Sequence, residues 1–239
     1  MKIYIDIGHG EKGDPGAVKG TLVEHQMNIV TGYALAERLK QHGHIVKIEP
    51  GDLTIDASAR EANAFGATFM ISQHYNAGGG DRGEVIYSWK HGADKLANAC
   101  AAGLKAAGQT VVNAVKSKPN KAGKAEYFGI LRGAMMPGVI IEPVFLDNVI
   151  DRQIADTEVE QKRIGVCIAD AIAAVYGSSL GGDEYVSDVK IVAGGKFMTG
   201  VILKDGKSYA PVRELAESLG CKVKWDDMTH TVTVDKEGK

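Results

Sequence analysis

The stretch Ile3-Tyr4-Ile5-Asp6-Ile7-Gly8-His9-Gly10 decides the predicted fold and points to the chemistry. Isoleucine recurs at every second position within Lys2–Ile7, a period typical of a β-strand, and a histidine follows where the strand stops. Two other apolar runs also end at a residue that could bind a metal, a histidine in one and a glutamate in the other. Thr68–Ser72 leads into Gln73-His74-Tyr75-Asn76, and Val139–Ile141 leads into Glu142-Pro143.

Segments with helical periodicity separate these strands. The predicted helices are 26–42, 57–64, 94–107 and 159–175, and the remaining predicted strands of this part are 45–48 and 84–89. Strands that alternate with helices predict an α/β fold with a mostly parallel sheet. In such sheets functional groups gather at the carboxyl ends of the strands. His9, His74 and Glu142 are therefore expected at one edge, with Glu24 on the loop beside them.

This set of residue types suits a zinc hydrolase. Two histidines and one carboxylate form a catalytic zinc site when the fourth position is left to water. A second carboxylate outside the ligand set then takes the proton of that water and passes it to the leaving nitrogen. The residues predict His9, Glu24 and His74 as ligands and Glu142 as the base.

The choice of Glu24 is open at this stage, because Glu11, Asp14 and His25 compete with it on spacing alone. Glu142 is better marked, since it interrupts the apolar run 138–146. Burial of an unpaired carboxylate costs roughly several kcal/mol, which favours a functional role. The same burial is expected to raise the pKa of Glu142.

The sequence resembles the zinc-dependent N-acetylmuramoyl-L-alanine amidases of the Amidase_3 family, which cut the bond between N-acetylmuramic acid and L-alanine in peptidoglycan. Six segments carry the resemblance, in the family's order and over residues 1–176. They are Ile5–Gly10, Gly13–Ala17, Leu22–Glu24 with Asn28, Ser58–Asn63, Ile71–Ala77 and Ile141–Asn148.

The resemblance implies a sheet of about six strands, one zinc ion held by His9, Glu24 and His74, and Glu142 as the catalytic glutamate. It also places Asn76 and Arg132 near a shallow substrate groove. Asp6 is either a partner that orients a ligand histidine or a strand-end turn residue. Ile7 and Pro143 depart from common family residues without touching a proposed ligand, and segment 114–125 matches no motif.

Composition excludes several other classes of protein. With 28 basic and 30 acidic residues the net charge is -2, so no broad attraction to nucleic acid or anionic membrane is expected. The three cysteines are far apart and indicate neither a disulfide framework nor a thiolate metal site. No apolar run reaches 18 residues, and no secretory signal precedes the first strand. We therefore expect synthesis in the cytoplasm and action on the wall after phage-type release or in an autolytic setting. We expect the remaining histidines outside the site to be exposed to solvent, namely His42, His44, His91 and His230.

A second part follows the linker-like segment 177–188, which separates a catalytic domain at 1–176 from a small α+β module at 189–239. The module resembles the repeat found at the N-terminus of copper amine oxidases and in wall-associated proteins. It carries the segments Tyr209–Ala216, Leu219–Asp226 and Thr231–Val234. His230 and Cys221 alone cannot form a copper site. The module is expected either to target the cell wall or to mediate self-association. Trp225 and Tyr209 fit core packing better than sugar stacking.

Two alternative functions stay open on the sequence. The first is a zinc carboxypeptidase or endopeptidase that acts on the peptidoglycan stem peptides. The second is a wall-binding protein without catalytic activity, against which the complete set of ligand and base residues argues.

Overall fold

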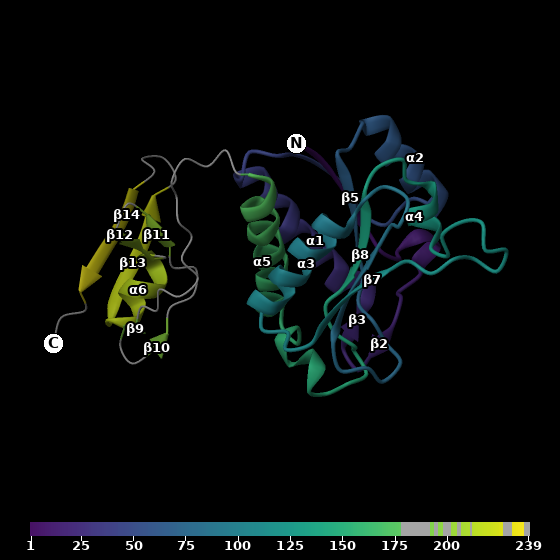
Figure 1. Cartoon of the computed structure of the whole chain (residues 1–239). Helices are drawn as coiled ribbons and strands as arrows, with labels where there is room; N and C mark the ends of the chain where they lie inside the picture. The colour runs from purple at the N-terminus through teal and green to yellow at the C-terminus, as the bar shows by residue number, and fades with distance from the viewer. Residues whose placement is uncertain are drawn as a thin grey trace. The chain divides into compact units, whose positions relative to one another are not determined.

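The structure, a computed structural model, describes residues 1–177 and the segments 192–193, 196–197, 202–204, 207–210, 212–226 and 231–236. The chain divides into two compact units, Met1–Ser179 and Leu180–Lys239 (Figure 1). Most of the predicted linker 177–188 lies outside the described residues. Each unit is therefore described by itself.

A mixed six-stranded sheet forms the centre of the described part of the first unit, with the order β4-β1-β5-β8-β6-β7. The strands are β1 (Lys2–Ile7), β4 (Ile45–Glu49), β5 (Phe69–Gln73), β6 (Gly83–Tyr87), β7 (Val112–Lys116) and β8 (Gly138–Glu142). Strands β4, β1, β5 and β8 are parallel, β6 runs antiparallel to β8, and β7 is parallel to β6. The prediction of a mostly parallel α/β sheet is confirmed.

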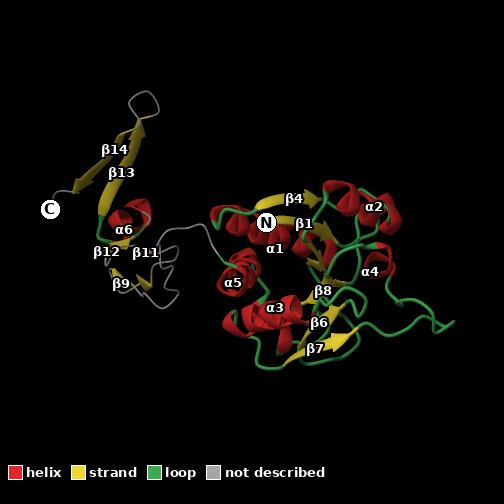
Figure 2. Ribbon diagram, turned by 45° about the horizontal axis from the view of Figure 1, so that its top comes forward, coloured by secondary structure: helices red, strands yellow, loops and turns green. Residues whose placement is uncertain are grey.

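Helices cover both faces of this sheet. Figure 2 shows α1 (Glu24–Gln41), α3 (Asp94–Ala106) and α5 (Glu158–Tyr176) on one side, with α2 (Ile55–Phe65) and α4 (Gly129–Gly133) on the other. Successive side chains of β1 point to opposite faces of the sheet. Ile3, Ile5 and Ile7 are buried in the core below α1 and α5, whereas Tyr4 joins the core below α2 and α4. Both faces of the strand are buried, as expected when helices cover both sides of a sheet.

Short turns and one hairpin precede the helices of this unit. A 3₁₀ turn at Glu11–Gly13 and the hairpin of β2 (Val18–Lys19) and β3 (Leu22–Val23) precede α1, and a second 3₁₀ turn covers Asp151–Ile154. Thr54 caps the N-terminus of α2, and its side chain accepts a hydrogen bond from the Ala57 amide. Helix α5 starts with a reciprocal capping box between Thr157 and Glu160.

Some elements differ from the sequence-based prediction. Strand β7 and the short helix α4 were not predicted, because the mostly exposed β7 lacks apolar alternation and α4 has only five residues. His42 and His44 are buried rather than solvated, and His42 Nε2 lies 2.6 Å from Asp170 Oδ1 on α5. His91 is exposed, whereas His230 lies outside the described residues.

The described residues of the second unit form short antiparallel strand pairs and one helix. The pairs are β9 (Val192–Ala193) with β10 (Lys196–Phe197), β11 (Ile202–Lys204) with β12 (Lys207–Tyr209), and β13 (Cys221–Asp226) with β14 (Thr231–Lys236), and the helix is α6 (Val212–Ser218). Trp225 keeps 47% of its surface exposed, so the prediction of core packing is wrong for that ring. The side chain of Tyr209 lies outside the described residues. Among the described helices, none has the length and apolarity needed to cross a membrane.

Candidate metal centre and catalytic carboxylate

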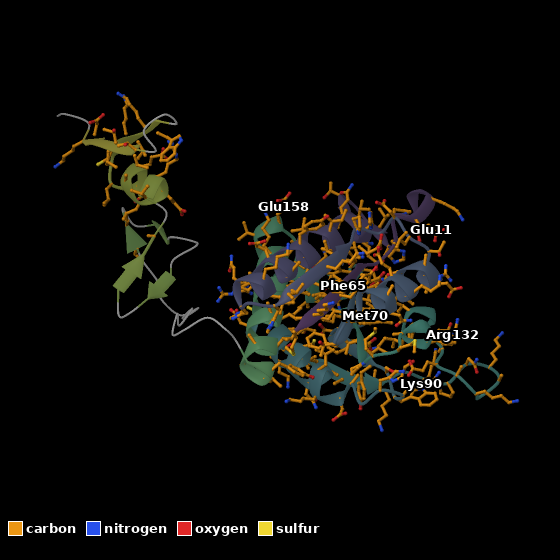
Figure 3. All side chains as sticks on the ribbon, turned by 90° about the horizontal axis from the view of Figure 1, so that it is seen from above. Glu11, Phe65, Met70, Lys90, Arg132 and Glu158 are labelled. Carbon is orange, nitrogen blue, oxygen red and sulfur yellow. The ribbon has the colours of Figure 1, made fainter. Side chains whose placement is uncertain are left out.

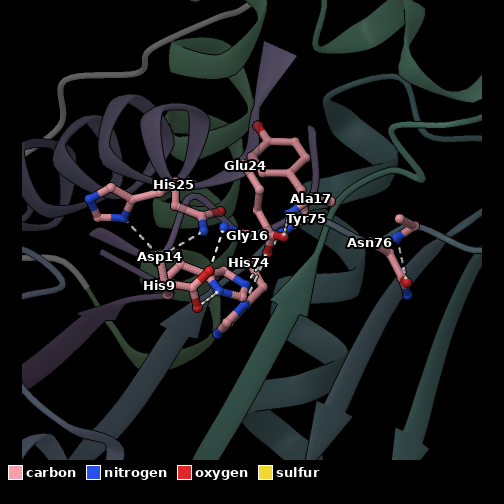
Figure 4. Close-up of polar contacts among 12 residues, drawn as sticks. His9, Asp14, Gly16, Ala17, Glu24, His25, His74, Tyr75 and Asn76 are labelled. Carbon is pink, nitrogen blue, oxygen red and sulfur yellow. Dashed lines mark hydrogen bonds and ion pairs between the residues drawn. The ribbon is translucent and has the colours of Figure 1, made fainter. Parts of the chain in front are cut away.

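Three parallel strands deliver the predicted site residues to one edge of the sheet. His9 follows β1, His74 follows β5, and Glu142 is the last residue of β8. Strand β5 lies between β1 and β8, so the carboxyl ends of the three strands are adjacent. Glu24, the first residue of α1, reaches the same edge after the β2–β3 hairpin. One ligand atom from each of His9, Glu24 and His74 lies within 4.8 Å of the other two (Figure 4).

The carboxylate of Glu24 is the centre of this cluster. It is 3% exposed, and its Oε1 lies 3.0 Å from His9 Nε2 and 3.1 Å from His74 Nδ1. The amides of Ala17 and Tyr75 donate to the carboxylate at 2.8 and 3.1 Å. Burial alone would raise the pKa of Glu24, but the hydrogen bonds from His74, His9 and Ala17 hold it well below its usual range. Glu24 is therefore ionised at neutral pH, as a metal ligand must be.

A second carboxylate orients His9. Asp14 Oδ2 lies 2.8 Å from His9 Nδ1, on the side of the ring away from Glu24. This contact fixes which nitrogen carries the proton and leaves Nε2 to face the cluster. The hydrogen bond that His9 donates to Glu24, opposed by burial and aided by Asp14, raises the pKa of His9 to about 9 in the metal-free chain.

Backbone geometry places these groups. His9 has a φ of 65°, a left-handed conformation that is uncommon for a residue with a side chain and that clusters at functional sites. A Cβ at Gly8 would overlap the imidazole of His74. A Cβ at Gly16, where φ is +66°, would stand 2.6 Å from Glu24 Oε2. Glycine at these two positions lets the backbone pass close to the ligand side chains.

The donor set fits a zinc ion. Ligands of a tetrahedral zinc at about 2.0–2.2 Å lie roughly 3.3–3.5 Å apart, close to the separations between Glu24 Oε1 and the two imidazole nitrogens. Two imidazoles with one carboxylate leave the fourth position open, which is the arrangement of catalytic rather than structural sites. Within the described residues this is the group of three metal-capable side chains that the structure brings together.

Glu142 stands beside the cluster in a different environment. Asn76 Nδ2 donates a hydrogen bond to Glu142 Oε2, and Asn76 Oδ1 accepts one from the Ala77 amide at 2.8 Å. Burial is the main cause that raises the pKa of Glu142 to about 7, Glu84 and Glu24 raise it further, and His74 opposes them. A carboxyl group with that pKa can both accept and return a proton near neutrality.

A cavity of about 270 Å³ opens next to the two histidines. Its polar lining includes His9, His74, Glu11 and Asp14, and its apolar lining is formed by Leu53, Ile55, Phe128, Ile130 and Ile140. The cavity therefore joins the two histidines to an apolar wall built from the start of α2 with the residues before it, β8 and the start of α4. Such a mixture of apolar surface and a few convergent polar groups is typical of a ligand site.

The structure places the remaining predicted residues as follows. Asn76 uses its amide to hold Glu142 and Glu84. Arg132 Nη1 donates to the carbonyls of Glu126 and Tyr127 at 2.9 and 3.1 Å, and Arg132 is not among the residues that line the cavity. Asp6 accepts hydrogen bonds from Ser58 and Ser72 and orients no ligand histidine.

Two residues that contact the site were not predicted in these positions from the sequence. Asp14 was considered only as a rival ligand, although an acidic residue five positions after a ligand histidine is close enough to bond its free nitrogen. Glu84 was not singled out, because its proximity to Glu142 depends on the pairing of β6 with β8. His25, another rival ligand, instead contacts the Gly8 carbonyl through Nδ1 at 3.0 Å.

Comparison with known families gives two matches along the chain. Residues 3–174 match the family described as N-acetylmuramoyl-L-alanine amidase. Residues 191–239 match the family described as copper amine oxidase N-terminal domain. The first match covers all six strands of the sheet except the first residue of β1, and it includes both histidines and both glutamates of the site.

Individual relatives agree with the first match. The chain is 30% identical over 158 residues to N-acetylmuramoyl-L-alanine amidase CwlM of Bacillus licheniformis, covering 64% of this chain and 60% of that protein. It is 30% identical over 156 residues to the sporulation-specific N-acetylmuramoyl-L-alanine amidase of Bacillus subtilis, covering 63% of this chain and 58% of the relative. The chain thus spans less than two thirds of these relatives.

A solved structure shares the fold. The catalytic domain of CwlV, an N-acetylmuramoyl-L-alanine amidase from Bacillus (Paenibacillus) polymyxa var. colistinus, superposes with a TM-score of 0.60 at 25% identity. The alignment covers 72% of this chain and 96% of that domain. The first unit therefore corresponds to a complete catalytic domain of that structure.

Proposed function

This chain belongs to the N-acetylmuramoyl-L-alanine amidase family, and from that premise we propose that it hydrolyses the amide bond between N-acetylmuramic acid and L-alanine in peptidoglycan with the help of one zinc ion. The observation that carries the proposal is the convergence of His9, Glu24 and His74 on one point, with Glu142 at the end of the neighbouring strand. A group of three ligands beside a carboxyl group with a pKa of about 7 suits amide hydrolysis by activated water.

His9, Glu24 and His74 would hold the zinc ion. When bound, zinc polarises the scissile carbonyl group and acidifies a water molecule. Asp14 keeps His9 Nε2 directed at the ligand cluster, and the amides of Ala17 and Tyr75 keep the Glu24 carboxylate in place. These contacts fix the ligands before a metal arrives, so little reorganisation is needed on binding.

Glu142 moves the proton. As a carboxylate it takes a proton from the attacking water, and as a carboxylic acid it gives that proton to the nitrogen of L-alanine, which then leaves as an amine. In the metal-free chain burial raises the pKa of Glu142 to about 7, so both protonation states are accessible near neutral pH. Asn76 holds one carboxylate oxygen so that the carboxyl group keeps its orientation during the transfer.

Product analysis tests the proposal against its rivals. Purified bacterial cell walls are digested with the zinc-loaded full chain, and the new amino termini and the reducing ends are identified by mass spectrometry. An amidase releases peptides that begin with L-alanine from intact glycan. Release of other amino termini would instead identify a carboxypeptidase or an endopeptidase, and wall binding without any product would identify a non-catalytic protein.

The role of the second unit also stays a prediction. Its family match is compatible with wall association, and Trp225 presents an exposed aromatic surface of the kind that stacks on sugars. Self-association through this module and the route by which the protein reaches the wall likewise stay predictions.

A further inference from the structure

A second carboxylate lies directly opposite the proposed base. Glu84 in β6 is the cross-strand partner of Glu142 in the antiparallel β6–β8 pair. Side chains that face each other in this way have Cβ atoms roughly 4.5–5.5 Å apart, and like charges at that distance destabilise the sheet. An unfavourable pair beside a reactive group indicates a role in the chemistry.

The surrounding contacts join the two carboxylates instead of separating them. Asn76 Nδ2 donates to Glu142 Oε2 and also to Glu84 Oε2, the latter at 3.1 Å. Arg82 Nε donates to Glu84 Oε1 at 2.7 Å, and its guanidinium lies 4.9 Å above the centre of the Phe145 ring. One polar chain therefore runs from Arg82 through Glu84 and Asn76 to Glu142.

The charged groups that face Glu142 come from three elements. His74 lies at the end of β5, Glu24 at the start of α1, and Glu84 on β6. His74 and Glu24 belong to the ligand cluster, so their charges are tied to metal binding. Glu84 is the facing charge outside that cluster, and its side chain is 18% exposed. Solvent therefore screens the electrostatic repulsion between Glu84 and Glu142 only weakly.

We propose that Glu84, held in place by Arg82, is a positioning residue that sets the pH range in which Glu142 works as the base. This inference rests on the proposed amidase function. The negative charge of Glu84 favours the protonated form of Glu142, so the proton taken from water is held until it reaches the leaving nitrogen. Arg82 limits the effect, because its positive charge offsets part of the Glu84 charge. The side-chain amide of Asn76 donates to both carboxylates and fixes their positions relative to each other.

The pH dependence of kcat/KM separates this role from a structural one. The zinc-loaded full chain is assayed on a soluble muropeptide, as wild type and as Glu84→Gln and Arg82→Gln. Glu84→Gln removes a negative charge, so the acidic limb of the profile moves to lower pH by roughly one unit. Arg82→Gln removes the compensating positive charge, so the acidic limb moves to higher pH. Two substitutions in one ion pair are thus expected to act in opposite directions.

A matched control removes a carboxylate elsewhere. Glu158→Gln removes a carboxylate that forms an exposed ion pair with Lys162 on α5. Figure 3 shows Glu158 far from Glu11, a residue that lines the cavity, so the pH profile of this variant should match that of the wild type. Zinc content should be the same in all four proteins. Shifts in the same direction, no shift in either variant, or loss of zinc from Glu84→Gln would overturn the inference. Failure of the amidase function itself is distinguishable, because the wild type would then release no L-alanine terminus.

Discussion

Glu24 and Glu142 are two glutamates at the same edge of one sheet, yet their surroundings drive them in opposite directions. Burial raises the pKa of both. Around Glu24, two imidazoles and the backbone amide of Ala17 outweigh burial and lower its pKa. Around Glu142, the charges of Glu84 and Glu24 add to burial and raise its pKa to about 7. Burial alone therefore does not decide what a carboxylate can do. Hydrogen-bond donors make Glu24 a permanent anion suited to a metal, whereas burial, aided by two neighbouring anions and only partly opposed by His74, makes Glu142 a proton carrier.

The strongest test of this comparison is Glu24→Gln. The neutral amide cannot replace the Glu24 carboxylate, the anionic member of the ligand set with His9 and His74. Zinc content should therefore fall from one ion per chain to near zero, and amidase activity should fall to background. Metal analysis after dialysis and the release of L-alanine termini measure the two effects. Circular dichroism and thermal unfolding control for the fold. A variant that keeps both zinc and activity would exclude Glu24 from the ligand set.

The matched substitution at the other glutamate should separate metal binding from catalysis. Glu142→Gln keeps the size of the side chain and removes the proton acceptor, so kcat/KM should fall by about 10²–10⁴-fold while one zinc ion per chain is retained. Steady-state kinetics on a soluble muropeptide and metal analysis provide the readings. Wild-type turnover in Glu142→Gln would assign the base to another residue, and loss of zinc would place Glu142 among the ligands.

Part of this comparison was predictable from the sequence. The strand ends at His9, His74 and Glu142 were visible because apolar runs of strand period stop at metal-capable residues. The rise in the pKa of Glu142 was predictable from its apolar neighbours in segment 138–146. A mostly parallel sheet then requires that the three strand ends meet, whatever the loop lengths between them.

The rest depends on contacts that no local pattern records. Spacing alone left Glu11, Asp14 and His25 as rivals of Glu24, and only the folded loop shows Asp14 behind His9 and His25 on the Gly8 carbonyl. Glu84 was missed because β6 and β8 are separated by β7 and two helices in the chain, and their antiparallel pairing reverses the strand direction inside a mostly parallel sheet.

Buried polar groups were the other source of error. His42 and His44 flank a glycine in a predicted turn and were expected in solvent, but both are buried and His42 contacts Asp170 on α5. Asp6 was considered as a partner of a ligand histidine, but its side chain bonds Ser58 and Ser72 below α2. For His42 and Asp6 a partner distant in the chain decides the environment, so the sequence pattern around these residues does not predict it.

A smaller effect is expected when the support of His9 is removed. Asp14→Asn keeps a side chain of similar size but replaces a charged hydrogen bond to His9 Nδ1 with a neutral one. Because such supporting groups orient metal ligands, zinc affinity should fall by about 10–100-fold. Competition with a chromophoric chelator measures the affinity. Asp156→Asn, which alters an exposed ion pair with Arg152, is the control and should bind zinc like the wild type. Equal affinity in Asp14→Asn would show that Asp14 does not support the site.

The smallest expected effect is the release of protons on metal binding, and it tests the electrostatics on the Glu24 side directly. In the metal-free chain the pKa of His9 is raised to about 9, so His9 carries a proton at pH 7.5, whereas the lowered pKa of Glu24 leaves it ionised. A zinc ligand must be an unprotonated imidazole, so His9 should contribute about one released proton per zinc ion at pH 7.5, and none above about pH 10. Since a raised pKa stabilises the protonated fold, the same His9–Glu24 contact should increase the free energy of unfolding of the metal-free chain below about pH 6.5 and lose its effect as the pH rises through about 9.

Isothermal titration calorimetry in two buffers with different ionisation enthalpies counts the protons that zinc binding releases. Asp14→Asn should lower the number released at pH 8, because it removes one of the two carboxylates that hold the proton on His9. If the number of released protons did not change between pH 7.5 and pH 10, the contact between His9 and Glu24 would not be the source of the effect, and the contrast between the two glutamates would lose its electrostatic basis.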